Sequence, residues 1–201
     1  MDIITDSVNK LEKIVEHSGC EDTGVCLEVD PDCKYCQYDR GACMIASFGG
    51  RSAEFVTDDP IRAMTKISFM FGAALDTPAT RSAACAIVNV ATGFFCLSRV
   101  LHSCPAASHA PCRQQLLETL AGKRVFFIGA MPALENDLRG MVAGSPEDAD
   151  VILINSEGII RPETGDLIGR AKETARIICL GPSTAGTARL LNLGHWCPYG
   201  T

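Results

Sequence analysis

The chain has 201 residues, of which 47% are hydrophobic and 21% are charged. This composition can bury a full core and excludes wholesale disorder, so it fits one medium-sized domain, or one domain with a small appendage. A net charge of −6, with no local cluster of Lys and Arg, argues against binding to nucleic-acid phosphates.

The first part of the chain predicts a helix, a loop and a hairpin. Apolar residues recur at helical spacing over residues 3–17. Residues 18–43 are polar and rich in Cys, with little periodicity. Two short strands are expected on either side of Gly49-Gly50. The sequence Asp-Asp-Pro at 58–60 then predicts the start of a helix that ends near residue 75.

Neither terminal nor internal apolar segments have the pattern of a membrane or export signal. Residues 1–19 are charged and amphipathic, unlike a signal peptide. The longest apolar region, 83–101, is interrupted by polar residues and falls short of the roughly 20 apolar residues that a membrane span requires. We therefore expect a soluble, cytoplasmic protein that does not enter a membrane.

The middle of the chain predicts two helices separated by a loop. The first, over about 79–100, carries many small residues, which favour close packing against a sheet or a partner helix. Residues 102–112 contain two Pro and predict a loop. Residues 113–121 predict a short helix that ends at Gly122.

From residue 122 onward, short apolar runs alternate with helical patterns. Buried strands are expected at about 124–129, 150–155 and 176–180, with helices after the second and third. This alternation is typical of a parallel, doubly wound sheet. We predict an α/β fold, with a Rossmann-like domain over 77–201 and a smaller Cys-rich α+β region over 1–76.

Open α/β sheets bind ligands at the carboxyl ends of their strands, so the loops after the three predicted strands are candidate cofactor-binding segments. A simple helix-capping role for the Gly-Pro-Ser-Thr turn is the alternative. Neither of the standard glycine-rich phosphate-binding motifs is present. The candidate residues are Gly129, Pro132, Asn155, Ser156, Gly181, Ser183 and Thr184.

Three segments are similar to a known domain: GKRVFFIGAMPAL, ADVILINSEGIIRPETGDLI and IICLGPSTAGTARLLNLG. Together they resemble the C-terminal Rossmann-like domain of an uncharacterised family labelled as heavy-metal chelation domains. The resemblance covers about residues 80–195 and implies that fold together with a chelating role. The chain departs from the family at Ala130-Met131, where His-Phe is usual, and at Glu163, where Asn is usual.

The chain contains 11 Cys, a high count for a protein expected in the cytosol, where clustered thiols bind metal more often than they form disulfides. Cys33 and Cys36 have the C-x-x-C spacing of a zinc or iron–sulfur site. The complete group matches no standard zinc or ferredoxin pattern, and reduced thiols without a role are the alternative. The candidate ligands are Cys20, Cys26, Cys33, Cys36 and Cys43.

Two further groups could supply ligands. The loop that follows the small-residue helix carries His102, Cys104, His109 and Cys112, which could bind zinc alone or join the first group if the fold brings them together. His195 and Cys197 form a weaker third group. Cys85, Cys96 and Cys179 lie in apolar patterns and are expected to be small core residues.

No catalytic motif stands out, so whether the chain is an enzyme stays open. The leading hypothesis is a cytoplasmic protein that binds a metal ion or a metal-containing small molecule through thiolates, with zinc or an iron–sulfur cluster as the cofactor. One alternative is a transferase that binds a nucleotide-like cofactor such as S-adenosylmethionine at the strand ends. Another is a scaffold that forms a homodimer through the helix at 79–100.

Overall fold

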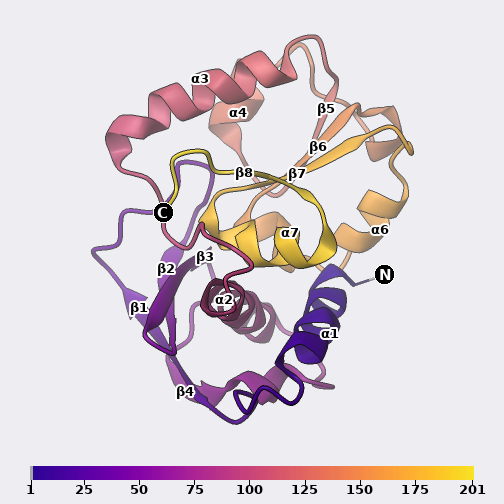
Figure 1. The fold of residues 1–201 in the computed structure, drawn as a ribbon. Helices are drawn as coiled ribbons and strands as arrows, with labels where there is room; N and C mark the ends of the chain where they lie inside the picture. The colour runs from indigo at the N-terminus through magenta and orange to yellow at the C-terminus, as the bar shows by residue number, and fades with distance from the viewer. Residues whose placement is uncertain (1) are drawn as a thin grey trace.

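The computed structural model describes residues 2–201, which form two four-stranded sheets (Figure 1). One sheet is antiparallel, in the order β3-β2-β1-β4, and the other is parallel, in the order β5-β6-β7-β8. The predicted α/β class is therefore confirmed. The strands are β1 (Gly24–Asp30), β2 (Ala42–Phe48), β3 (Arg51–Thr57), β4 (Ala63–Lys66), β5 (Val125–Ile128), β6 (Val151–Ile154), β7 (Arg176–Leu180) and β8 (Gly194–Trp196).

Seven α-helices and four 3-10 turns connect these strands within the described chain. None of the helices in residues 2–201 is long and apolar enough to cross a membrane. The α-helices are α1 (Ile3–Val15), α2 (Pro78–Phe94), α3 (His109–Leu120), α4 (Pro132–Asp137), α5 (Ser156–Ile160), α6 (Thr164–Gly169) and α7 (Ala185–Leu191). The 3-10 turns are η1 (Ile67–Met70), η2 (Ala106–Ser108), η3 (Pro146–Asp148) and η4 (Pro182–Thr184).

The antiparallel sheet confirms one sequence prediction and corrects two. The hairpin β2–β3 turns at Gly49-Gly50, which adopt φ of 57° and 77°, values that favour glycine. Residues 24–30, expected in a loop, form β1 at the centre of the sheet. The helix expected over 60–75 is wrong, because residues 63–66 pair with β1 as strand β4 and a 3-10 turn follows. Pairing of this segment with β1 at the edge of the sheet outweighs the helix-start signal of residues 58–60.

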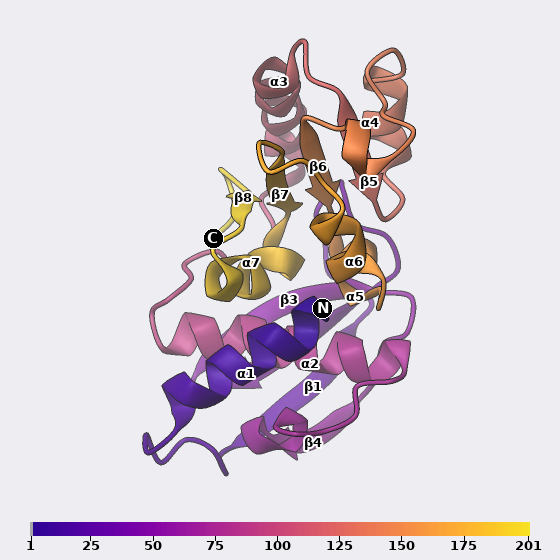
Figure 2. The same ribbon diagram turned by 90° about the vertical axis from the view of Figure 1, so that its right-hand side faces the viewer.

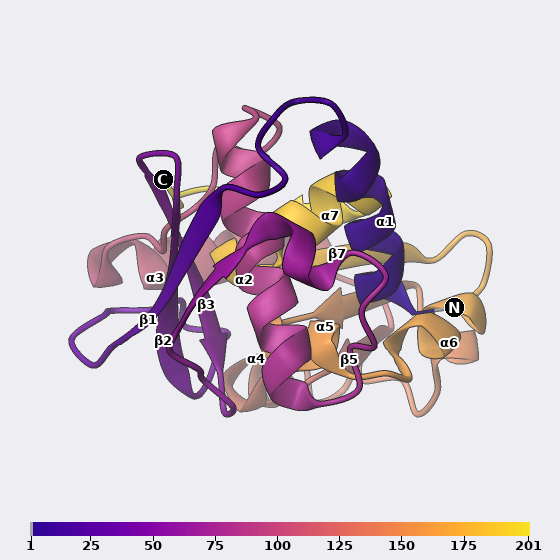
Figure 3. The same cartoon turned by 90° about the horizontal axis from the view of Figure 1, so that it is seen from below.

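Helix α2 lies between the two halves of the molecule (Figures 2 and 3). Every residue from Arg81 to Gly93 is buried, and the helix contacts β2 and β3 on one side and α7 on the other. Its small residues therefore pack against a sheet, one of the two outcomes predicted. Because α2 contacts both halves, the hydrophobic core is continuous between them.

The parallel sheet has one strand more than predicted. β8 follows α7 and pairs with β7, so the segment that ends the chain belongs to the sheet. Helix α3 begins at His109, earlier than predicted, because Pro111 fits in the first turn of a helix. The carboxyl ends of β5, β6 and β7 face the antiparallel sheet, so that segments of the N-terminal half cover them (Figure 2).

Candidate functional site

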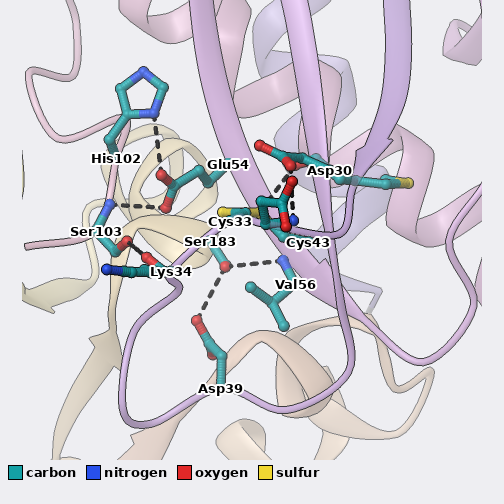
Figure 4. The surroundings of a disulfide bond; sticks show 12 residues. Asp30, Cys33, Lys34, Asp39, Cys43, Glu54, Val56, His102, Ser103 and Ser183 are labelled. Carbon is teal, nitrogen blue, oxygen red and sulfur yellow. Dashed lines mark hydrogen bonds and ion pairs between the residues drawn. A yellow bond between two sulfur atoms is a disulfide. The ribbon is translucent and has the colours of Figure 1, made fainter. Parts of the chain in front are cut away.

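A single segment, residues 31–41, crosses from the antiparallel sheet to the strand ends of the parallel sheet. We call it the strap. It links β1 to β2, has no helix or strand of its own, and is closed at its base by a Cys33–Cys43 disulfide (Figure 4). Gln37 Nε2 donates to the carbonyl oxygen of His109 at 2.6 Å, and Asn155 Nδ2 donates to that of Tyr38 at 2.9 Å. The strap is thus fixed to the C-terminal half by hydrogen bonds.

The carboxylate of Asp39 lies at the centre of the contact between the strap and the strand ends. The hydroxyl of Ser183 donates to one of its oxygens (Figure 4), and the N–H of Ser156 donates to the other, each at 3.1 Å. Asp39 is only 4% exposed and forms no ion pair within residues 2–201. Burial raises the pKa of its carboxyl to about 6, although these hydrogen bonds oppose the shift.

The predicted cofactor-binding residues do come together at these strand ends. Gly129 adopts φ of 95°, and its missing Cβ leaves room for the side chain of Asn155, which caps α5 through Gly158 N–H. Thr184 donates to the carbonyl oxygen of Leu180 at 2.9 Å and so serves its own turn. The set that was proposed to hold a ligand therefore holds the strap: Ser156 and Ser183 bind the Asp39 carboxylate, and Asn155 binds the carbonyl oxygen of Tyr38. Whether it also binds a cofactor stays a prediction.

Two cavities flank the strap, and Arg40 lines both. The larger, of about 180 Å³, lies between Arg40, Glu157 and Arg161 and is otherwise lined mainly by residues 57–59, 76–81 and 160–162. The smaller, of about 130 Å³, lies between strap residues Gln37, Tyr38 and Arg40 and the segment 130–134. Open space therefore remains next to Arg40, the residue that follows Asp39 in the strap.

The five cysteines of the first predicted group do not form one cluster. Cys20 follows α1 in a turn, Cys26 lies within β1, and Cys33 and Cys43 are joined in the disulfide. Of these five cysteines, only Cys36 contacts the C-terminal half, where its side chain is buried against the turn at Gly181. A Cβ at Gly181 would lie 3.1 Å from its sulfur.

Cys36 instead meets thiols from the second and third groups. Cys112, on α3, lies 3.6 Å from the hydroxyl of Tyr38 in the strap, and both belong to the apolar cluster that contains Cys36. Cys197, directly after β8, lies against Gly200 beside the carbonyl oxygen of His102. We call Cys36, Cys104, Cys112 and Cys197 the four-thiol cluster.

The thiols of this cluster are close enough to influence each other's ionisation. The pKa of Cys197 is raised to about 12, first by burial and then by the neighbouring Cys104 and Cys112. The pKa of Cys36 is raised by burial, by Asp39, and by Cys197 and Cys112. The pKa of Cys104 is raised by burial and then by Cys112. Cys36, Cys104 and Cys197 are therefore protonated at neutral pH in the isolated protein.

The histidines of the second and third groups have other surroundings. His102 Nδ1 lies 3.2 Å from the carboxylate of Glu54, which also accepts the N–H of Ser103 at 2.8 Å (Figure 4). His195 Nε2 lies 2.8 Å from the carbonyl oxygen of Gly181. His109 Nε2 is buried and has no hydrogen-bond partner in the described chain. Of the three, only His109 lacks a partner for its buried ring nitrogen.

In residues 2–201, no three His, Cys, Asp or Glu side chains stand close enough, as placed, to hold a metal ion together. The four-thiol cluster is thus a neighbourhood of thiols rather than a formed coordination sphere. Asp39 was not among the predicted site residues, and Cys197 was placed only in the weaker third group. No local signal marked Asp39, whereas the proximity of Cys197 follows from β8, which the sequence did not predict.

Comparisons with known proteins give little guidance. No family model and no curated protein matches the chain. One solved structure with a similar arrangement is a protein of unknown function of the DUF364 family from Pyrococcus horikoshii. It shares 12% identity over 90% of this chain and 79% of that chain, with a TM-score of 0.48. A likeness of this size carries no information on function.

Proposed function

We propose that this protein binds a thiophilic metal, either a zinc-like ion or an iron–sulfur cluster, through the four-thiol cluster of Cys36, Cys104, Cys112 and Cys197. The observation that carries the proposal is the convergence of four thiols from four separate segments: the strap, the loop before α3, α3 itself, and the turn after β8. Four thiolates are a complete ligand set for either group.

The chemistry of the donor set fits such a group. Burial and mutual repulsion oppose thiolate formation in the isolated protein, and a bound cation removes both penalties because it compensates the charge. Rotation about the bond from Cα to Cβ moves a cysteine sulfur, so we expect side-chain rotations to close the coordination sphere. We expect binding to order the side chains rather than the backbone.

A buried ring nitrogen on α3 adds support. His109 Nε2 has no hydrogen-bond partner in residues 2–201. His109 lies three residues before Cys112, so the two side chains share a face of α3. Buried polar atoms without partners are rare in folded proteins, and metal-bound thiolates accept N–H bonds. We expect the thiolate of Cys112 to accept a hydrogen bond from His109 when a metal is bound.

The test is a metal titration of reduced protein under anaerobic conditions. Cobalt(II) is the probe for the ion, because thiolate coordination produces a charge-transfer band, and reconstitution with iron and sulfide tests the cluster. We expect stoichiometric binding by the wild-type chain. We expect Cys112→Ser and Cys197→Ser to weaken it at least about tenfold, as for loss of one ligand.

Cys96→Ser is the matched control, because Cys96 is exposed in the turn after α2, not a core residue as expected, and does not belong to the cluster. It should bind like the wild type. Circular dichroism establishes that each variant is folded. If Cys112→Ser and Cys197→Ser bind cobalt and reconstitute as well as Cys96→Ser, the proposal is wrong.

A further inference from the structure

The carboxylate of Asp39 occupies the position where open α/β sheets receive a ligand. Ser156 follows β6 and Ser183 follows β7, and both donate to this carboxylate from the carboxyl ends of their strands. The carboxylate itself comes from the strap, which belongs to the other half of the chain. Asp39 therefore stands in this pocket as a bound small acid would.

We propose that the pocket around the Asp39 carboxylate is a binding site for the carboxylate of a small organic acid, and that the strap fills this pocket when the acid is absent. This inference concerns a different site from the four-thiol cluster and goes beyond the proposed metal binding.

The donors in the pocket select a carboxylate. Both are neutral, one backbone N–H and one hydroxyl, and they match the two oxygens of a carboxylate one to one. No Lys or Arg in the described chain forms an ion pair with Asp39, and the charge of Glu54 opposes further negative charge nearby. A phosphate dianion would bring twice the charge and more oxygens than the pocket can satisfy.

The remainder of the acid has space in two cavities beside Arg40, the residue that follows Asp39 in the strap. Arg40 lines both the cavity of about 180 Å³ and the cavity of about 130 Å³, and Gln37 and Tyr38 also line the smaller one. Ile160, Pro162 and Met131 provide apolar walls. If residues 37–40 move outward, the two cavities and the pocket join into one crevice at the ends of β5, β6 and β7, which suits a molecule of a few carbon atoms.

The experiment removes the built-in carboxylate and supplies one from solution. Asp39→Ala is melted with increasing formate or acetate, in the presence of a chelator, with chloride and phosphate at equal ionic strength as comparisons. We expect a saturable rise in melting temperature with formate and acetate only. We also expect the exchange of the Ser156 amide hydrogen to slow about tenfold at saturation. Asp32→Ala, which removes an exposed carboxylate of the strap, is the matched control and should show neither effect.

Equal responses of Asp39→Ala to acetate and chloride would overturn the proposal. If Asp39→Ala does not fold, the isosteric variant Asp39→Asn provides a second test, with amide exchange at residues 37–40 as the measurement. Its strap lacks the carboxylate, so acetate should displace it and speed amide exchange at residues 37–40, whereas chloride should not. Unchanged exchange in acetate would likewise overturn the proposal. Because every measurement is made without metal, failure of metal binding at the four-thiol cluster leaves these outcomes unaffected.

Discussion

Asp2 and Arg81 are 79 residues apart in the sequence, yet the carboxylate of Asp2 accepts hydrogen bonds from both terminal nitrogens of Arg81, at 2.6 and 3.1 Å. The same carboxylate caps α1 through the N–H of Ile4 at 2.9 Å. Arg81 is only 3% exposed and also donates to the carbonyl oxygens of Ile160 and Leu75. This pair therefore joins the start of α1 to the start of α2 and to α5.

Asp2→Asn should destabilise the protein by about 2 kcal/mol, because it leaves the buried guanidinium without its counter-charge. Burial acts to raise the pKa of Asp2, but Arg81 and the N–H groups of Thr5 and Ile4 outweigh it and lower the pKa below 3.8. Since the folded-state pKa lies below the unfolded-state value, the contribution is present above about pH 4 and is lost as pH falls below it. Urea unfolding at several pH values measures this contribution. The free energies of unfolding of the wild type and of Asp2→Asn should become equal in acid.

Asp39 should give the opposite pH dependence. Its folded-state pKa of about 6 lies above the ordinary 3.8, so the folded chain holds the proton more tightly than the unfolded chain. This contribution is complete below about pH 4 and is lost as pH rises to about 6, by roughly 3 kcal/mol at 1.36 kcal/mol per pKa unit. Asp39→Asn should remove this loss. The free energy of unfolding is measured in urea at several pH values between 4 and 6. If it changes with pH equally in the wild type and in Asp39→Asn, the prediction is wrong.

Reduction of the Cys33–Cys43 disulfide should loosen the strap. The bond shortens the free part of the loop, but β1 and β2 already hold its ends. We therefore expect a loss of only about 1–2 kcal/mol. Trypsin should cleave after the exposed Lys34 and Arg40 several-fold faster in Cys33→Ser/Cys43→Ser than in the oxidised wild type. Cleavage after Arg51, outside the strap, is the internal reference and should not change.

Gly158 is required for α5 to pack on β5. A Cβ at this position would collide with the carbonyl oxygen of Ile128, so Gly158→Ala must push the helix away from the strand. We expect a loss of about 2–4 kcal/mol in chemical unfolding. Gly140→Ala is the matched control, because no described atom lies within 4 Å of the position that its methyl group would take, and it should be close to neutral. Similar losses for both would show that the close approach has no energetic importance.

The sequence was sufficient for features that depend on neighbouring residues. The apolar runs of β5, β6 and β7 and the glycine pair of the β2–β3 hairpin were all predicted. Features that depend on distant partners were not. β4 forms because β1 lies beside it, and the same is true of β8 beside β7. Buried Asn89 on α2 likewise depends on distant partners: it donates to the carbonyl oxygen of Ser183 at 2.8 Å and accepts the N–H of Gly186 at 2.8 Å.

The candidate site illustrates the same limit. Cysteines were grouped by their spacing along the chain, whereas the four-thiol cluster takes one from the first group, two from the second and one from the third. The spacing of cysteines within a short segment predicts only which thiols that segment can place side by side, not which thiols meet in the fold. The strap places Cys36 in the C-terminal half. The path of the strap depends on tertiary hydrogen bonds, such as that from Asn155 to the carbonyl oxygen of Tyr38.

The position of α2 has a consequence for how the molecule comes apart. The helix is buried from Arg81 to Gly93, with β2 and β3 on one side and α7 on the other. If either sheet melted alone, α2 would expose an apolar face to water, at a cost of about 25 cal/mol for each Å². We therefore expect the two halves to unfold as one cooperative unit, in a single step on heating and without a half-folded intermediate that a protease could cleave.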